Sequence, residues 1–210
     1  MKKLIPILLA VFAFTACEKD PDMDKLDNDY LVYTNYDKQA KFNEFSTYYL
    51  PDKILIITDK EEPEYLEGEA AETILAAYAK NMDARGYTMA PSKEEADLGI
   101  QVSYIKSTYF FTDYGYPEWW WGYPGYWGPG YWGNWGGGWY YPYAVNYSYS
   151  TNSFITELVN LKAPEGPKEK LPVLWSSYMT GPVYSSSMNT TLAVRGVNQA
   201  FAQSPYLTNK

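Results

Sequence analysis

Alternating hydrophobic and polar positions predict the clearest strand of the chain. In DLGIQVSYI, residues 97–105, leucine, isoleucine, valine and tyrosine alternate with glycine, glutamine and serine. A period of two is typical of a strand that buries one face and exposes the other to water. The pattern therefore predicts that Gln101 and Ser103 lie on a solvent-exposed face of this strand.

Other strands are predicted from short runs of β-branched and aromatic residues. These runs cover residues 31–36, 47–50, 53–58 and 171–179. The run KILIIT at 53–58 is apolar enough to be buried on both faces. Residues 145–149 and 154–162 predict a hairpin around Thr151-Asn152-Ser153, where Asn152 can adopt the left-handed conformation that a turn requires.

Two segments have the spacing of amphipathic helices. The first extends from about Glu64 to Arg85 and stops before Gly86, which can supply a positive φ. The second is capped by Ser187 or Asn189 and ended by Pro205. Their predicted inner faces are Ala71, Ile74, Leu75, Tyr78 and Met82 in the first, and Ala193, Val197, Ala200 and Phe201 in the second.

Together these elements predict an α+β fold. Strands with one polar face and only two helices indicate a mostly antiparallel sheet with both helices packed on one face, a two-layer sandwich. We expect residues 30–210 to form a single domain of this kind, interrupted by one long insertion between two strands.

That insertion, at about residues 107–142, is rich in tryptophan, tyrosine and glycine. Seven of the eight tryptophans lie in it, namely Trp119, Trp120, Trp121, Trp127, Trp132, Trp135 and Trp139. Its many glycines and prolines exclude a regular helix or strand, so we expect a connection and not a core. Because so much aromatic surface is costly to leave in water, we expect it to fold partly over the sheet and partly to present rings outward.

Three roles are open for the outward rings. They could bind another envelope protein, since tryptophan and tyrosine dominate interaction hot spots. They could stack on a glycan, with Asp113, Glu118 or Asn134 accepting hydroxyl hydrogen bonds, or they could lie at a lipid interface. No Lys or Arg lies between Lys106 and Lys162 to assist lipid contact. The alternative is a self-packed insertion without a ligand.

The N-terminus predicts an exported, lipid-anchored protein. Lys2 and Lys3 precede a short apolar run, residues 4–14, which fits a secretory signal and is too short to span a bilayer. The sequence Phe14-Thr15-Ala16-Cys17 resembles the bacterial lipobox, and Cys17 is the only cysteine of the chain. This resemblance implies that residues 1–16 are a signal peptide and that Cys17 is lipidated. Residues 17–29 then form an acidic tether to the outer membrane.

The amino-acid composition limits the kinds of catalytic and metal-binding site that the chain can form. The chain has no histidine, and its lone cysteine is the predicted lipidation site, so Ser-His-Asp, Cys-His and His/Cys zinc sites are excluded. Catalysis by carboxylates alone stays open, although most acids lie in charged, exposed-looking runs. The net charge of −8 disfavours nucleic-acid binding. We therefore expect a non-enzymatic protein without a metal or cofactor.

Several segments, in order, resemble a bacterial lipoprotein family known as domain of unknown function 4136. They are residues 33–52, 84–104, 154–162 and 171–181. The matching pieces include Phe45-Ser46-Thr47-Tyr48, Gly86-Tyr87, Ala96-Asp97-Leu98 and the strand that ends in Trp175. The resemblance implies a fold and an envelope location, and it carries no catalytic residues. The expected function is that of a lipid-anchored envelope protein, a structural or protein-interaction module, or alternatively a glycan-binding lipoprotein.

Overall fold

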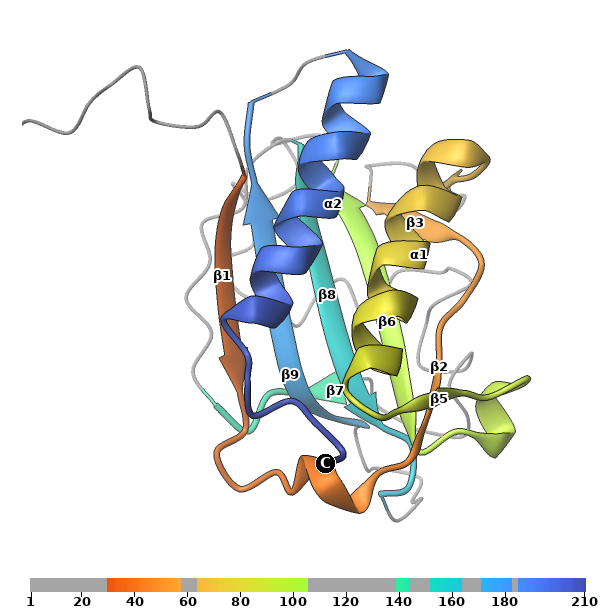
Figure 1. The fold of residues 1–210 in the computed structure, drawn as a ribbon, viewed down its shortest axis with the longest axis vertical. Helices are drawn as coiled ribbons and strands as arrows, with labels where there is room; N and C mark the ends of the chain where they lie inside the picture. The colour runs from red at the N-terminus through yellow and green to blue at the C-terminus, as the bar shows by residue number, and fades with distance from the viewer. Residues whose placement is uncertain (1–29, 58–63, 106–138, 144–151, 164–170, 183–184) are drawn as a thin grey trace, which may run out of the picture.

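Four strands form the main part of the sheet, and each neighbouring pair is antiparallel. In spatial order they are β1 (Leu31–Tyr36) at the edge of the sheet, β9 (Leu171–Thr180), β8 (Ser153–Asn160) and β6 (Leu98–Ile105). This arrangement is seen in a computed structural model that describes residues 30–57, 64–105, 139–143, 152–163, 171–182 and 185–210 (Figure 1).

Short strands extend the sheet at its edges. They are β2 (Thr47–Tyr49), β3 (Ile54–Ile57), β4 (Glu64–Leu66), β5 (Thr88–Met89) and β7 (Trp139–Tyr140). Both β2 and β3 pair in parallel with β6, at its first and last residues respectively, while β7 pairs in parallel with the start of β9. The predicted mostly antiparallel sheet is therefore confirmed for its long strands, and parallel pairs occur where the short strands join.

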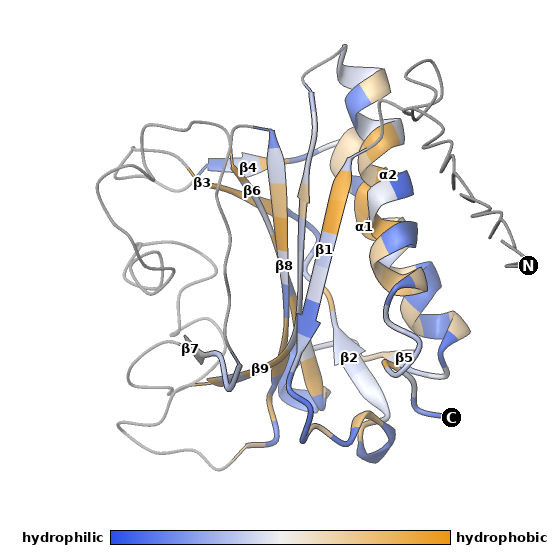
Figure 2. Cartoon of the chain, turned by 90° about the vertical axis from the view of Figure 1, so that its left-hand side faces the viewer, coloured by the Kyte–Doolittle hydropathy of each residue, from blue (hydrophilic) through white to orange (hydrophobic). Residues whose placement is uncertain are grey.

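Two helices, α1 (Glu69–Ala84) and α2 (Ser186–Ala202), cover one face of the sheet, as predicted (Figures 1 and 2). They run side by side and begin at the same end of the sheet (Figure 1). The amide of Asn81 on α1 donates a hydrogen bond to Asn198 Oδ1 on α2 at 2.8 Å. Two 3-10 turns, η2 (Phe42–Glu44) and η3 (Lys93–Glu95), lie in the connections.

The predicted inner faces of both helices are confirmed, because all of their residues are buried. The starts differ from the prediction. Residues 64–66 form β4, and α1 begins only after Gly68. The φ of 77° at Gly68 is not a helical value, so the helix cannot extend through this residue. The N-cap position of the second helix is Ser185, whose side chain makes no capping hydrogen bond, and not the predicted Ser187 or Asn189.

Two of the positive φ values occur where the sequence predicts them. Gly86 follows α1 with φ of 91°, and Asn152 precedes β8 with φ of 57°. Asn152 also holds that end of the sheet together. Its amide donates to the carbonyl oxygens of Gly181 and Pro182, at 3.1 and 2.7 Å, and its Oδ1 accepts from the Tyr104 hydroxyl at 3.3 Å.

Gly196 allows α2 to approach the sheet closely. A Cβ atom at this position would lie 2.8 Å from Met179 Sδ on β9. Glycine weakens a helix interior by about 1 kcal/mol relative to alanine, so its presence here is explained by packing and not by helix propensity.

The other face of the sheet is also buried at β6, β8 and β9, which corrects the sequence prediction for β6. Gln101 and Ser103 on β6 are only 5% and 2% exposed. A second apolar cluster on this face includes Leu55, Ile155 and Val173, and Tyr141 and Tyr143 pack against it. Figure 2 shows β7 on this side, opposite the helices. The alternating pattern correctly separated the apolar face of β6 from its polar face. A polar face can still be covered by another segment, and the pattern does not contain that information.

Candidate functional site

Polar side chains form a row across the covered face of the sheet, opposite the helices. Gln101 on β6 lies beside Glu157 on β8, Glu157 lies beside Ser176 on β9, and Ser176 lies beside Asn35 on β1. Apolar residues flank the row along β8, where Ile155 and Val159 belong to the second cluster. We call Gln101, Glu157, Ser176 and Asn35 the polar row.

Residues 139–143, which we call the strap, lie over this row. The strap begins with β7, whose two residues pair with Leu171 and Pro172 of β9. Two of its tyrosine hydroxyls then reach the polar row. Tyr141 donates a hydrogen bond to Glu157 Oε1 at 2.8 Å, and Tyr143 donates one to Ser176 Oγ at 3.1 Å.

Glu157 is the unusual member of the row because it is an acid with no exposed surface. Its second oxygen, Oε2, has no hydrogen-bond partner among the described residues. Burial raises the pKa of Glu157 from its ordinary value of 4.5 to about 8, although the hydrogen bond from Tyr141 acts in the opposite direction. The carboxyl group is therefore protonated and neutral at pH 7, since a buried charge without a partner is costly.

The row combines hydrogen-bond donors and acceptors without carrying a net charge at neutral pH. It does not assemble the two carboxyl groups that glycoside hydrolysis uses. The other buried acid of the described residues, Asp97, is paired with Lys162 and lies at the start of β6. Within the described part of the chain, no three potential metal ligands come together. The arrangement is suited to holding a polar segment by hydrogen bonds.

Most residues that the sequence singled out lie outside the described residues. These are Cys17, Trp119, Trp120, Trp121, Trp127, Trp132 and Trp135. Trp139 is described through its backbone, which forms the first residue of β7. The expectation that the insertion folds partly over the sheet is confirmed for Tyr141, near the insertion's end. The outward-facing rings stay a prediction.

Sequence reasoning missed Glu157. The signal was present, because a single acid stands in the middle of the apolar strand FITELVNL, residues 154–161. An acid at the centre of such a strand is either exposed on a polar face or buried with a specific partner. The sequence analysis did not single out this acid, and the structure has the second arrangement, with Tyr141 as the partner.

Concave regions also lie elsewhere among the described residues, two of them against the sheet. A groove of about 610 Å³ lies between α2 and β1, with Asn198, Gln199 and Gln203 on its helical side. A smaller, mostly apolar pocket of about 160 Å³ lies where both helices begin, between Ile74 and Phe154. Neither contains a residue of the polar row. No helix in the described part of the chain is long and apolar enough to cross a membrane.

Comparison with known proteins identifies the family. The model of the family "Domain of unknown function (DUF4136)" matches residues 32–206. The chain belongs to the DUF4136 family. A solved DUF4136 protein, BT2437 from Bacteroides thetaiotaomicron, is 72% identical in sequence, with a TM-score of 0.81. The match covers 88% of this chain and 100% of that one. No curated protein matches the chain.

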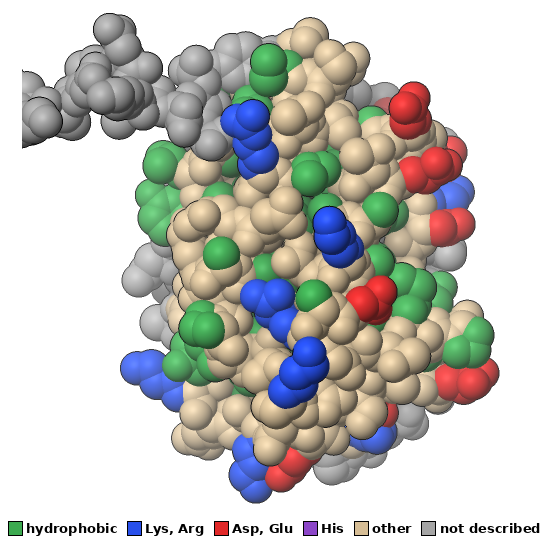
Figure 3. Space-filling model, in the orientation of Figure 1, with side chains coloured by type: hydrophobic (Ala, Val, Ile, Leu, Met, Phe, Trp, Pro, Cys, Tyr) green, Lys and Arg blue, Asp and Glu red, His purple; other side chains and the backbone are tan. Residues whose placement is uncertain are grey.

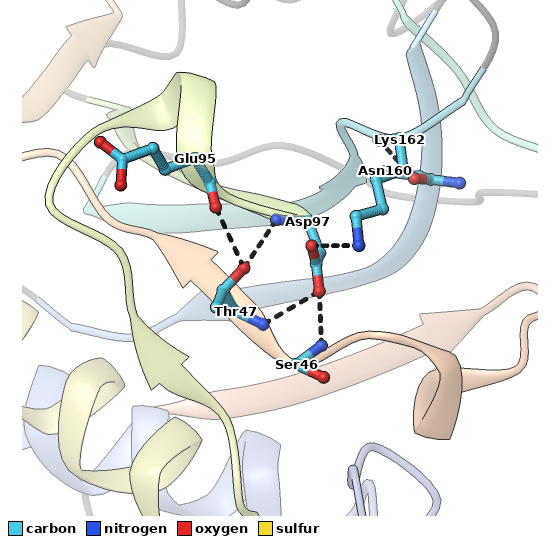
Figure 4. A network of polar contacts seen from close by, with 6 residues as sticks. All are labelled: Ser46, Thr47, Glu95, Asp97, Asn160 and Lys162. Atoms are coloured by element: carbon cyan, nitrogen blue, oxygen red, sulfur yellow. Dashed lines mark hydrogen bonds and ion pairs between the residues drawn. The ribbon is translucent and has the colours of Figure 1, made fainter.

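The structure gives a physical role to two segments on which the resemblance to the DUF4136 family rested. Ser46 and Thr47 meet Asp97 at the edge where β2 joins β6 (Figure 4). Asp97 Oδ2 accepts from the backbone amides of Ser46 and Thr47 at 2.6 and 3.1 Å. In return, the Asp97 amide donates to Thr47 Oγ1 at 3.0 Å. Asp97 therefore fastens the short strand β2 to the long strand β6.

Lys162 completes this network from the end of β8, with Nζ 2.6 Å from Asp97 Oδ1. Burial alone would raise the pKa of Asp97, but the hydrogen bonds from Lys162 and from the two backbone amides outweigh it. The pKa of Asp97 is thus lower than its ordinary value. These DUF4136 residues form a structural junction on the outer part of the sheet, apart from the polar row.

Proposed function

We propose that this DUF4136 protein is a lipid-anchored outer-membrane protein whose α+β body serves as a non-enzymatic structural or protein-interaction module. The observation that carries the proposal is the lone Cys17 at the end of Phe14-Thr15-Ala16-Cys17, after a short apolar run. Stable anchoring needs more than one acyl chain, and a fully acylated N-terminal cysteine meets this requirement.

The described part of the molecule is compatible with such an anchor. Tyr30, the first described residue, is buried and packs beside Phe154 and Gly181 at one end of the sheet. About twelve residues separate it from Cys17, and a flexible segment of that length has a root-mean-square reach of roughly 20 Å. The body would therefore stay close to the membrane surface.

Lipidation is tested on protein from its native envelope. Cells are grown with an alkyne fatty acid, and the wild type is compared with Cys17→Ser. Label on the wild type alone, a mature N-terminus at residue 17 and co-fractionation with the outer membrane would support the proposal. An unmodified thiol, or a retained residue 1, would refute the anchor.

The interaction role is tested separately by cross-linking in intact cells. The wild type is compared with a variant in which Trp119, Trp120, Trp121, Trp127, Trp132 and Trp135 are replaced by serine. We expect the wild type to be cross-linked to a defined envelope protein and the variant to lose this product. Glycan-dependent quenching of tryptophan fluorescence would instead support the glycan-binding alternative. Turnover of a glycoside that requires Glu157 would refute the non-enzymatic assignment.

A further inference from the structure

The contacts of the strap with the sheet include the two-residue strand β7, the hydroxyl hydrogen bonds of Tyr141 and Tyr143, and the packing of these two side chains against the second apolar cluster. Tyr141 and Tyr143 are themselves only half-buried, whereas Glu157 below them has no exposed surface. Water can therefore reach the Glu157 carboxyl group only if the cover above it moves.

The surroundings of Glu157 contain no compensating cation among the described residues. On the strap it faces Tyr141 and Tyr143, on β6 Gln101, and on β9 Ser176, with Tyr178 one pair further along that face. Asp97, the other buried acid among the described residues, is paired with the exposed Lys162 at the start of β6.

We propose that the protonation of Glu157 controls the strap. The strap is seated on the polar row while the carboxyl group is protonated, and it opens when the carboxyl group ionises and takes up water. This proposal goes beyond the function proposed above and does not depend on lipidation of Cys17. Its partner is internal, the chain's own residues 139–143, so the device would switch the end of the aromatic insertion between a seated and an open position.

The sign and size of the effect follow from linkage. Opening exposes Glu157 and returns its pKa from about 8 toward the ordinary value of 4.5. Between these two values the open form has lost a proton that the seated form retains. The opening equilibrium constant should therefore rise by about tenfold for each pH unit between 4.5 and 8, and level off outside that range.

Hydrogen exchange of the full chain between pH 5 and pH 8 tests the proposal. Observed rates are divided by intrinsic rates to give protection factors for the strap amides and, as an internal reference, for the amides of α1. In the wild type we expect strap protection to fall about tenfold per pH unit. In Glu157→Gln, which keeps the shape but cannot ionise, strap protection should stay high and independent of pH.

Two further variants make every outcome decisive. Glu44→Gln, at an exposed glutamate, should retain the wild-type pH dependence. Tyr141→Phe should lower strap protection at all pH values and retain the slope, because burial of Glu157 is the main cause of its raised pKa. A flat wild-type profile, an equally steep profile in Glu157→Gln, or an equal fall in α1 amides would refute the proposal. If Glu157→Gln fails to fold, the wild-type and Tyr141→Phe profiles decide alone.

Discussion

Replacing Asp97 with asparagine tests the junction between β2 and β6. The carboxylate accepts two backbone hydrogen bonds and one from Lys162, and Asp97 is only 6% exposed. Asparagine keeps one acceptor oxygen, but its NH₂ group would face either the backbone amides or the Lys162 ammonium group. All of these are donors, so a hydrogen bond is lost on that side. Hydrogen bonds to a charged group contribute about 1.5–3 kcal/mol each. With one such bond lost and the others weakened, we expect the free energy of unfolding to fall by about 3 kcal/mol.

The assay is urea unfolding followed by circular dichroism at pH 7. With a urea m-value of about 2 kcal/mol per molar, this loss lowers the midpoint by about 1.5 M. Lys162→Met is the matched control, because the Lys162 side chain is 60% exposed and the pair is screened by water. That variant should lose less than about 1 kcal/mol.

The pH dependence gives a second readout with a definite sign. The pKa of Asp97 is lowered in the folded state, so its contribution is present above the unfolded pKa and is lost as pH falls through the folded pKa. Wild-type stability should therefore drop on acidification below about pH 4, and this component should be absent in Asp97→Asn. A midpoint of Asp97→Asn within experimental error of the wild type, or an equal loss in Lys162→Met, would refute the reasoning.

Three other substitutions test the packing, each by the same unfolding assay. Gly181→Ala places a methyl group against the Tyr30 ring, and we expect a loss of about 1–3 kcal/mol from overpacking; wild-type stability would show that Tyr30 is not seated there. Asn152→Ala and Asn152→Gly both lose the amide hydrogen bonds, but only alanine strains the positive φ at this position. Asn152→Ala should therefore be the less stable of the two variants, and the reverse order would contradict this. Trp175→Phe removes the indole bond to Ser204 Oγ at 2.8 Å and leaves a cavity, at an expected cost of about 2–4 kcal/mol; a neutral effect would rule out this contact.

Much of the fold could be predicted because its elements follow local rules. The period of α1 and α2, the turn at Gly86 and the left-handed Asn152 depend on the residues themselves, and all are confirmed. The pairing of β2 and β3 with the two ends of β6 could not be predicted, since parallel pairing between short strands is set by tertiary contacts.

The polar row escaped sequence analysis for a related reason. Gln101 and Glu157 are ordinary surface residues by type, and only the register between β6 and β8 brings them side by side. Their burial depends further on a cover that includes Tyr141, which is distant from β6 in the sequence. The two-residue period therefore identified the polar face of β6 correctly, but it led to the wrong prediction that this face is exposed to solvent.

The common starting end of α1 and α2 gives the molecule an electrical direction (Figure 1). Their peptide dipoles point the same way, and each contributes about half a positive charge at its first turn. Glu69 and Glu72 offset this charge on α1, whereas the first turn of α2 contains no acid. The groups coloured red and blue in Figure 3 are unevenly spread over the helical side. In an external field these two aligned dipoles contribute a torque, which favours one orientation of the helical side toward a charged surface.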